Sequence, residues 1–152
     1  MKRALFISYN GIKGIGAPQV IEGENRLAIV LPGVPMSEYL GIDPVLRKQK
    51  MIELFYCEEV LEQHDPSILV MYIGDHGLAQ AFSLASMLAG EDKELHFVSC
   101  ECQSKRKKEL CGEWLLPNPH FHETTCGGEY VMRALLDQFI ATGVITCFPR
   151  QG

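Results

Sequence analysis

The chain has 152 residues, of which 47% are hydrophobic and 22% are charged, and its formal net charge is -5. A chain of this length forms one ordinary domain, and a composition so close to the globular average argues against disorder. Domains that bind nucleic acids usually carry a net positive charge. We therefore expect a single domain over residues 1–152 that does not bind nucleic acid.

No segment has the pattern of a targeting or membrane-spanning sequence. The apolar run Ala4-Leu5-Phe6-Ile7 is shorter than the apolar core of a signal peptide. No stretch reaches the roughly 18–20 apolar residues that cross a bilayer. We therefore expect a cytoplasmic protein without a membrane partner, whose six cysteines stay reduced as core residues, metal ligands or reactive thiols.

The amino-terminal part of the chain predicts two strands around a glycine-rich segment. Residues 3–8 and residues 26–31 are short apolar runs, each followed by a turn sequence. The segment between them contains several glycines and Pro18, which favours a loop or a hairpin over a helix. The sequence allows the two strands to pair as a hairpin, and that pairing would make the sheet mixed.

The rest of the chain alternates predicted helices with predicted strands. Strand 67–73 is apolar almost throughout, as is typical of a strand buried on both faces of a parallel sheet. We expect a single Rossmann-like three-layer α/β domain with a mainly parallel sheet of about five strands. Within it, helix 75–89 should join strands 67–73 and 94–100 in a right-handed crossover. The remaining expected elements are helices over about 45–61, 104–114 and 129–142, an irregular segment over 117–128, and a strand over 144–148.

Polar residues follow the predicted strands at their carboxyl ends, where open parallel sheets bind ligands. Asp75-His76 follows strand 67–73, and it suits either an acid/base pair or an ordinary helix N-cap. Gly11, Lys13 and Gly14 follow the first strand and could bind a cofactor phosphate through backbone amides. Their spacing is the reverse of the dinucleotide-binding fingerprint, so a flexible hairpin loop is the alternative.

Cysteines and histidines gather in the region after strand 94–100. Zinc binds four sulfur and imidazole ligands, whereas an iron–sulfur cluster typically binds four thiolates. If the 117–128 segment folds over the end of the strand, either group could be held there. Buried cysteines are often only packing residues, and reactive thiols without metal are a further alternative. The candidate metal ligands are Cys100, Cys102, His120, His122 and Cys126.

These features lead to two main functional hypotheses. The first is a small cytoplasmic enzyme or accessory protein with a Cys/His metal or thiol site at the carboxyl edge of the sheet. The second is a non-catalytic sensing or interaction module that binds a nucleotide-like or anionic small molecule at the same edge. The sequence does not decide between enzyme and module, and it leaves the oligomeric state open, a homo-oligomer included.

Overall fold

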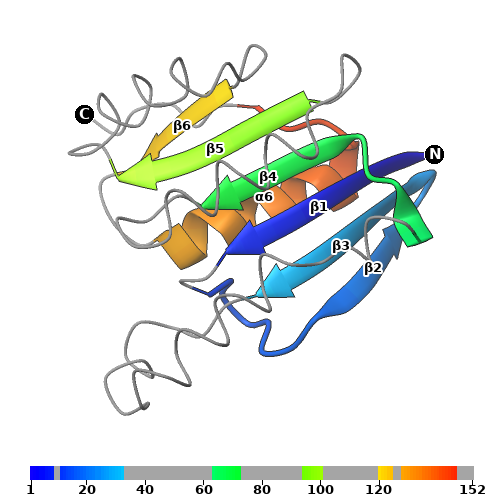
Figure 1. The fold of residues 1–152 in the computed structure, drawn as a ribbon, viewed down its shortest axis with the longest axis horizontal. Helices are drawn as coiled ribbons and strands as arrows, with labels where there is room; N and C mark the ends of the chain where they lie inside the picture. The colour runs from blue at the N-terminus through cyan, green and yellow to red at the C-terminus, as the bar shows by residue number, and fades with distance from the viewer. Residues whose placement is uncertain (9–10, 33–62, 73–93, 101–119, 125–127, 147–152) are drawn as a thin grey trace.

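The computed structural model of the chain describes residues 1–8, 11–32, 63–72, 94–100, 120–124 and 128–146. In these ranges the chain forms one six-stranded sheet with a helix packed on one face (Figure 1). The elements are β1 (Lys2–Ser8), β2 (Gln19–Gly23), β3 (Arg26–Pro32), β4 (Ile68–Tyr72), β5 (Glu94–Cys100), β6 (His120–Thr124) and α6 (Gly128–Thr142).

The sheet has the strand order β2-β3-β1-β4-β5-β6. All neighbouring strands are parallel except β2, which runs antiparallel to β3. The prediction of a mainly parallel α/β sheet is therefore confirmed, and β4 and β5 are parallel neighbours as expected. The helix expected over 75–89, and the crossover that it would form, lie outside the described residues, as do the helices expected over 45–61 and 104–114.

The amino-terminal strands β1 and β3 do not form the hairpin that the sequence allowed. β1 and β3 are parallel, with Lys2 opposite Arg26 and Ser8 opposite Pro32. The chain between them is long enough for a parallel return, and it contains β2, which forms the actual hairpin with β3. The turn of that hairpin includes Asn25, whose φ of 56° is tolerated best by glycine, asparagine and aspartate.

The carboxyl-terminal third confirms one predicted element and corrects two. The helix expected over 129–142 is present as α6, and it ends at Gly143, whose φ of 74° suits glycine after a helix. The prediction of an irregular 117–128 segment was wrong for residues 120–124, which form β6. Residues 144–146 are not in a strand. No helix within the described ranges is long and apolar enough to cross a membrane.

The core lies on both faces of the sheet. On one face, α6 packs its apolar side against β1, β3, β4 and β5, and the rings of Phe6 and Phe139 lie 5.9 Å apart. The alternate side chains of the same strands point to the other face and are also buried, among them Leu5, Leu69 and Phe97. Burial on both faces explains why the buried stretches 4–7 of β1 and 68–71 of β4 contain only apolar residues.

Candidate metal site

Four polar side chains of β5 and β6 adjoin the apolar core on one face of the sheet. Residues two apart on a strand share a face, and so do opposite residues of neighbouring parallel strands. His96 is opposite His120, and Val98, which belongs to the core under α6, is opposite His122. The side chains therefore lie on the α6 face, in what we call the Glu/His cluster: Glu94, His96, His120 and His122.

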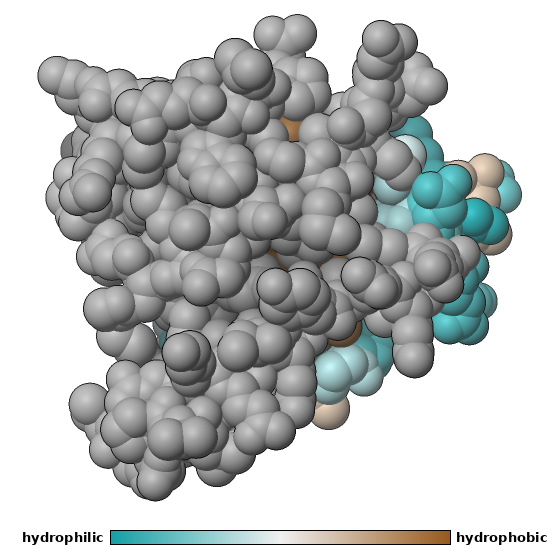
Figure 2. Space-filling view, viewed as in Figure 1, coloured by the Kyte–Doolittle hydropathy of each residue, from teal (hydrophilic) through white to brown (hydrophobic). Residues whose placement is uncertain are grey.

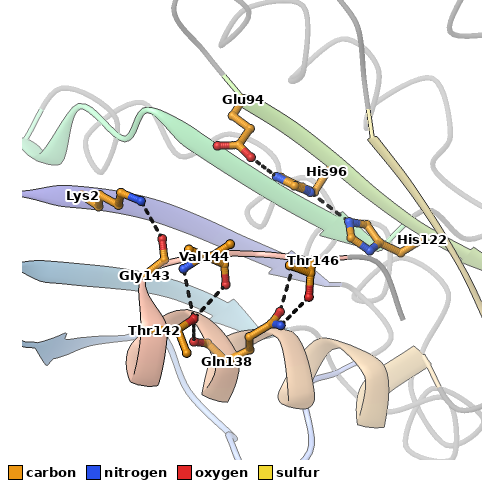
Figure 3. A network of polar contacts seen from close by, with 9 residues as sticks. All are labelled: Lys2, Glu94, His96, His122, Gln138, Thr142, Gly143, Val144 and Thr146. Carbon is orange, nitrogen blue, oxygen red and sulfur yellow. Dashed lines mark hydrogen bonds and ion pairs between the residues drawn. The ribbon is translucent and has the colours of Figure 1, made fainter. Parts of the chain in front are cut away.

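His96 is the centre of the Glu/His cluster. Its Nε2 lies 2.7 Å from Oε1 of Glu94, and its Nδ1 lies 2.9 Å from Nε2 of His122 (Figure 3). The ring of His120 stacks on the ring of His96, with centroids 4.8 Å apart and planes 18° apart. The register of the parallel strands holds the three imidazoles together.

Burial divides the Glu/His cluster into an inner and an outer half. The side chains of His96 and His122 are each only 2% exposed, whereas Glu94 and His120 are exposed. Burial lowers the pKa of His96 below its usual value, against the opposing effect of Glu94. Burial, with a smaller contribution from the neighbouring histidines, lowers the pKa of His122 to about 4. Both inner rings are therefore neutral near pH 7.

One buried nitrogen of the cluster has no partner. Nδ1 of His122 is inaccessible to solvent and makes no hydrogen bond within the described part of the chain. Most buried polar atoms are hydrogen-bonded, because an unpaired one costs about 1–3 kcal/mol. The unpaired nitrogen of His122 thus lowers the stability of the fold, whereas an apolar side chain in the same place would not.

Glu94, His96 and His120 lie close enough together to serve as ligands of one metal ion. Donor atoms of Glu94, His96 and His120 all lie within 4.8 Å of one another. Zinc–nitrogen bonds of 2.0–2.1 Å in a tetrahedron place the donors about 3.3 Å apart. Exposed Glu94 and His120 can close that difference by moving their side chains, while buried His96 stays fixed.

The structure brings only part of the predicted metal site together. His120 and His122 lie with Glu94 and His96, not with Cys100. Cys100 is opposite Thr124 at the carboxyl end of β5, four residues beyond His96, or about 13 Å along the strand. Cys102 and Cys126, like the predicted pair Asp75 and His76, lie outside the described residues, so their proposed roles stay predictions.

The predicted cofactor loop is anchored to α6. We call residues 11–16 the glycine loop. Gly14 has a φ of 81°, as the third residue of a type II turn requires, and the turn is closed by a hydrogen bond from N of Ile15 to O of Ile12. Ile12 and Ile15 are buried under α6. The role proposed for Gly11, Lys13 and Gly14 in cofactor binding remains a prediction, because this anchoring by itself accounts for the loop's conformation.

Lys13 is engaged with the beginning of α6. Its backbone N donates to O of Glu129, its O accepts from Arg133, and its ammonium lies 5.2 Å from the ring centroid of Tyr130. Ser8 closes the start of the loop by donating to O of Gly11. The polar groups of this loop are therefore largely used within the fold.

A shallow depression of about 590 Å³ lies at the other end of α6, beside the amino ends of β1 and β3. Its two cationic side chains bind carbonyl oxygens at the carboxyl end of α6: Nζ of Lys2 donates to O of Gly143, and Arg26 donates to O of Ile140. The described surface at the amino ends of the strands is mostly hydrophilic (Figure 2). No member of the Glu/His cluster lines this depression.

Sequence reasoning missed Glu94 and His96. The pattern that could have found them is alternation: Glu94-x-His96 and His120-x-His122 both place polar residues at every second position. In a strand, that spacing puts both side chains on one face. In β5, such a polar pair stands on one face of a largely apolar strand, which is the pattern of a site.

Comparisons with known protein families, with curated proteins and with solved structures found no significant match. The function of the chain is therefore inferred from the geometry of the Glu/His cluster.

Proposed function

We propose that this protein binds a divalent transition-metal ion, zinc foremost, through Glu94, His96 and His120. The observation that carries the proposal is the convergence of one carboxylate and two imidazoles within 4.8 Å on one face of the sheet. Two imidazoles and one carboxylate are a ligand set that zinc uses in open sites. The proposal keeps the metal hypothesis and its histidine ligand His120, with Glu94 and His96 in place of the cysteines.

The donor set favours zinc over an iron–sulfur cluster. Iron–sulfur clusters are held mainly by cysteine thiolates, and the described ligand group contains none. Copper and nickel also bind imidazole, and copper binds most sites of this kind more tightly than zinc does. In cells the choice among these ions follows their availability as well as affinity, which favours zinc.

The exposure of the ligands supports an open coordination position. Glu94 and His120 are exposed, so an ion held between them faces solvent. Three protein ligands leave the fourth position of a tetrahedral zinc ion for water, and zinc lowers the pKa of that water to about 7. The chemistry that we assign to such a position is activation of water, in an enzyme of metal-assisted hydrolysis.

We also propose that the sheet is the middle layer of a Rossmann-like three-layer domain. The support is the burial of Leu5, Ile7, Leu69 and Phe97 on the face opposite α6. Side chains that are this apolar and buried require cover on that face as well. A crystal structure with helices on one face only would overturn this architecture.

The test of metal binding is elemental analysis after dialysis against zinc, followed by titration with a competing chelator. The wild-type chain should hold one zinc per chain. His120→Gln and Glu94→Gln should each weaken binding by at least 10-fold, because each removes a ligand. The matched controls are His64→Gln and Glu22→Gln, which change the same residue types outside the cluster and should bind zinc as the wild type does. A wild-type chain that binds no more zinc than His120→Gln would overturn the proposal.

A further inference from the structure

His122 is the only member of the Glu/His cluster outside the proposed ligand set, yet it contacts the central ligand. Its Nε2 lies 2.9 Å from Nδ1 of His96, and both side chains are buried. The contact leaves the other nitrogen of His96, Nε2, facing Glu94. His122 is thus placed to control which nitrogen of His96 carries the proton.

Without metal, the partners of His96 fix the direction of this hydrogen bond. An ionised carboxylate only accepts hydrogen bonds, so the 2.7 Å contact with Glu94 requires a proton on Nε2 of His96. In the neutral ring, Nδ1 then carries a lone pair and accepts. His122 must therefore donate from its Nε2.

Metal binding requires the opposite direction. An ion bound by His96 at Nε2 takes the lone pair of that nitrogen, so the proton of the neutral ring must be on Nδ1. We infer that zinc binding reverses the hydrogen bond between His96 and His122, and that His122 is the positioning residue of the site. The inference rests on the metal site proposed above.

The reversal is balanced in protons. The proton on Nε2 of His96 leaves to solvent, and the proton on Nε2 of His122 moves to Nδ1 of His96. His122 then takes up one proton from solvent on its own Nδ1, which balances the proton that His96 releases. Each ring begins and ends neutral, with one proton.

The unpartnered nitrogen of His122 is free to take up this proton. Because Nδ1 of His122 has no hydrogen-bond partner among the described residues, its protonation breaks no existing bond. A histidine suits the position because the same ring atom donates in one state and accepts in the other. Partners of this kind fix the orientation of metal-bound histidines, and their loss typically costs 10–100-fold in affinity.

The decisive experiment is nitrogen-15 NMR of the wild-type chain at neutral pH, with and without zinc. Both His96 and His122 should carry their protons on Nε2 in the metal-free protein and on Nδ1 in the zinc-bound protein. A His122 that keeps its proton on Nε2 while zinc is bound would overturn the inference alone. A wild-type chain that binds no zinc would overturn the proposed function and this inference with it.

Two substitutions give a second test. His122→Leu leaves no hydrogen-bonding group beside His96 and should weaken zinc binding about 10–100-fold. His122→Gln keeps an amide that can accept or donate by turning over, and it should restore affinity to within about threefold of the wild type. A folded His122→Leu protein with wild-type zinc affinity would contradict the inference, and if that variant does not fold, the NMR experiment decides.

Discussion

The glycine loop and the Glu/His cluster both lie on the α6 face of the sheet, but they use polar groups in different ways. In the glycine loop, backbone groups pair within the loop or with α6, and two isoleucines are buried in the core. In the Glu/His cluster, His96 bonds to both His122 and Glu94, and Nδ1 of His122 has no hydrogen-bond partner among the described residues.

This difference separates a structural feature from a functional one. Each described contact of the glycine loop has a folding reason, because it satisfies a polar group or buries an apolar one. The buried imidazoles have no such folding reason. Apolar side chains of similar size would fill the same space without the free-energy cost of removing an imidazole from water. Buried imidazoles that cost folding free energy are best explained by a ligand that they bind.

The largest expected effect is a difference in unfolding free energy between alanine substitutions in the glycine loop and in the Glu/His cluster. Ile12→Ala should lower the free energy of unfolding by roughly 2–5 kcal/mol, because Ile12 is buried under α6. His120→Ala, at an exposed position, should change it by about 0.5 kcal/mol or less. Urea unfolding of the metal-free proteins measures both. Equal losses in the two variants would erase the distinction between the regions.

The next expected effect is an acid-sensitive stability that comes from the Glu/His cluster. The pKa of His122 is about 4 in the folded protein, against the 6.5 of an unperturbed histidine, so the unfolded chain binds more protons between these values. The free energy of unfolding should therefore fall as the pH falls from 6.5 to 4, by at most about 3 kcal/mol from this residue. Burial lowers the pKa of His96 as well, which gives its contribution the same sign.

Urea unfolding in the presence of a chelator, repeated across this pH range, measures the slope. His122→Gln should make the slope shallower, because the contribution of His122 is removed while that of His96 remains. An unchanged slope in that variant would show that the acid sensitivity comes from elsewhere.

A smaller effect tests the backbone of the glycine loop. Gly14 has a φ of 81°, so Gly14→Ala should destabilise the protein by about 1–2 kcal/mol. Gly16→Ala is the matched control, since a Cβ at Gly16 meets no atom within 4 Å and its φ is not positive. Thermal unfolding should rank the two variants in that order, and a Gly14→Ala protein as stable as the control would mean that the turn is not needed.

The smallest expected effect concerns the ion pair beside the glycine loop. Arg133 and Asp137 lie 3.0 Å apart on successive turns of α6, and both side chains are substantially exposed. Solvent screens such pairs, so Asp137→Asn should cost about 0.5 kcal/mol or less. A loss of about 2 kcal/mol or more in thermal unfolding, well above the range for exposed pairs, would show that Arg133 holds the loop more firmly than its exposure implies.

Local sequence determined the strands that are buried on both faces. The apolar runs of β1, β3 and β4 have too little polarity for any surface position, so burial in a parallel sheet follows from the residues. α6 was equally predictable, since its apolar spacing and the glycine after it mark a helix and its end. β6 was not predictable from the sequence, because His120–Thr124 contains a single apolar residue. It forms a strand by pairing with β5.

The sequence by itself determined that the chain forms a mainly parallel α/β sheet and that histidines near residue 120 are candidates for metal binding. Only the tertiary structure decided that His120 is opposite His96, which moves the site from the carboxyl ends of the strands to the amino ends of β5 and β6. The physical reason is that apolar and polar periodicity fix which face a side chain occupies, whereas strand register is set by contacts between residues far apart in the chain.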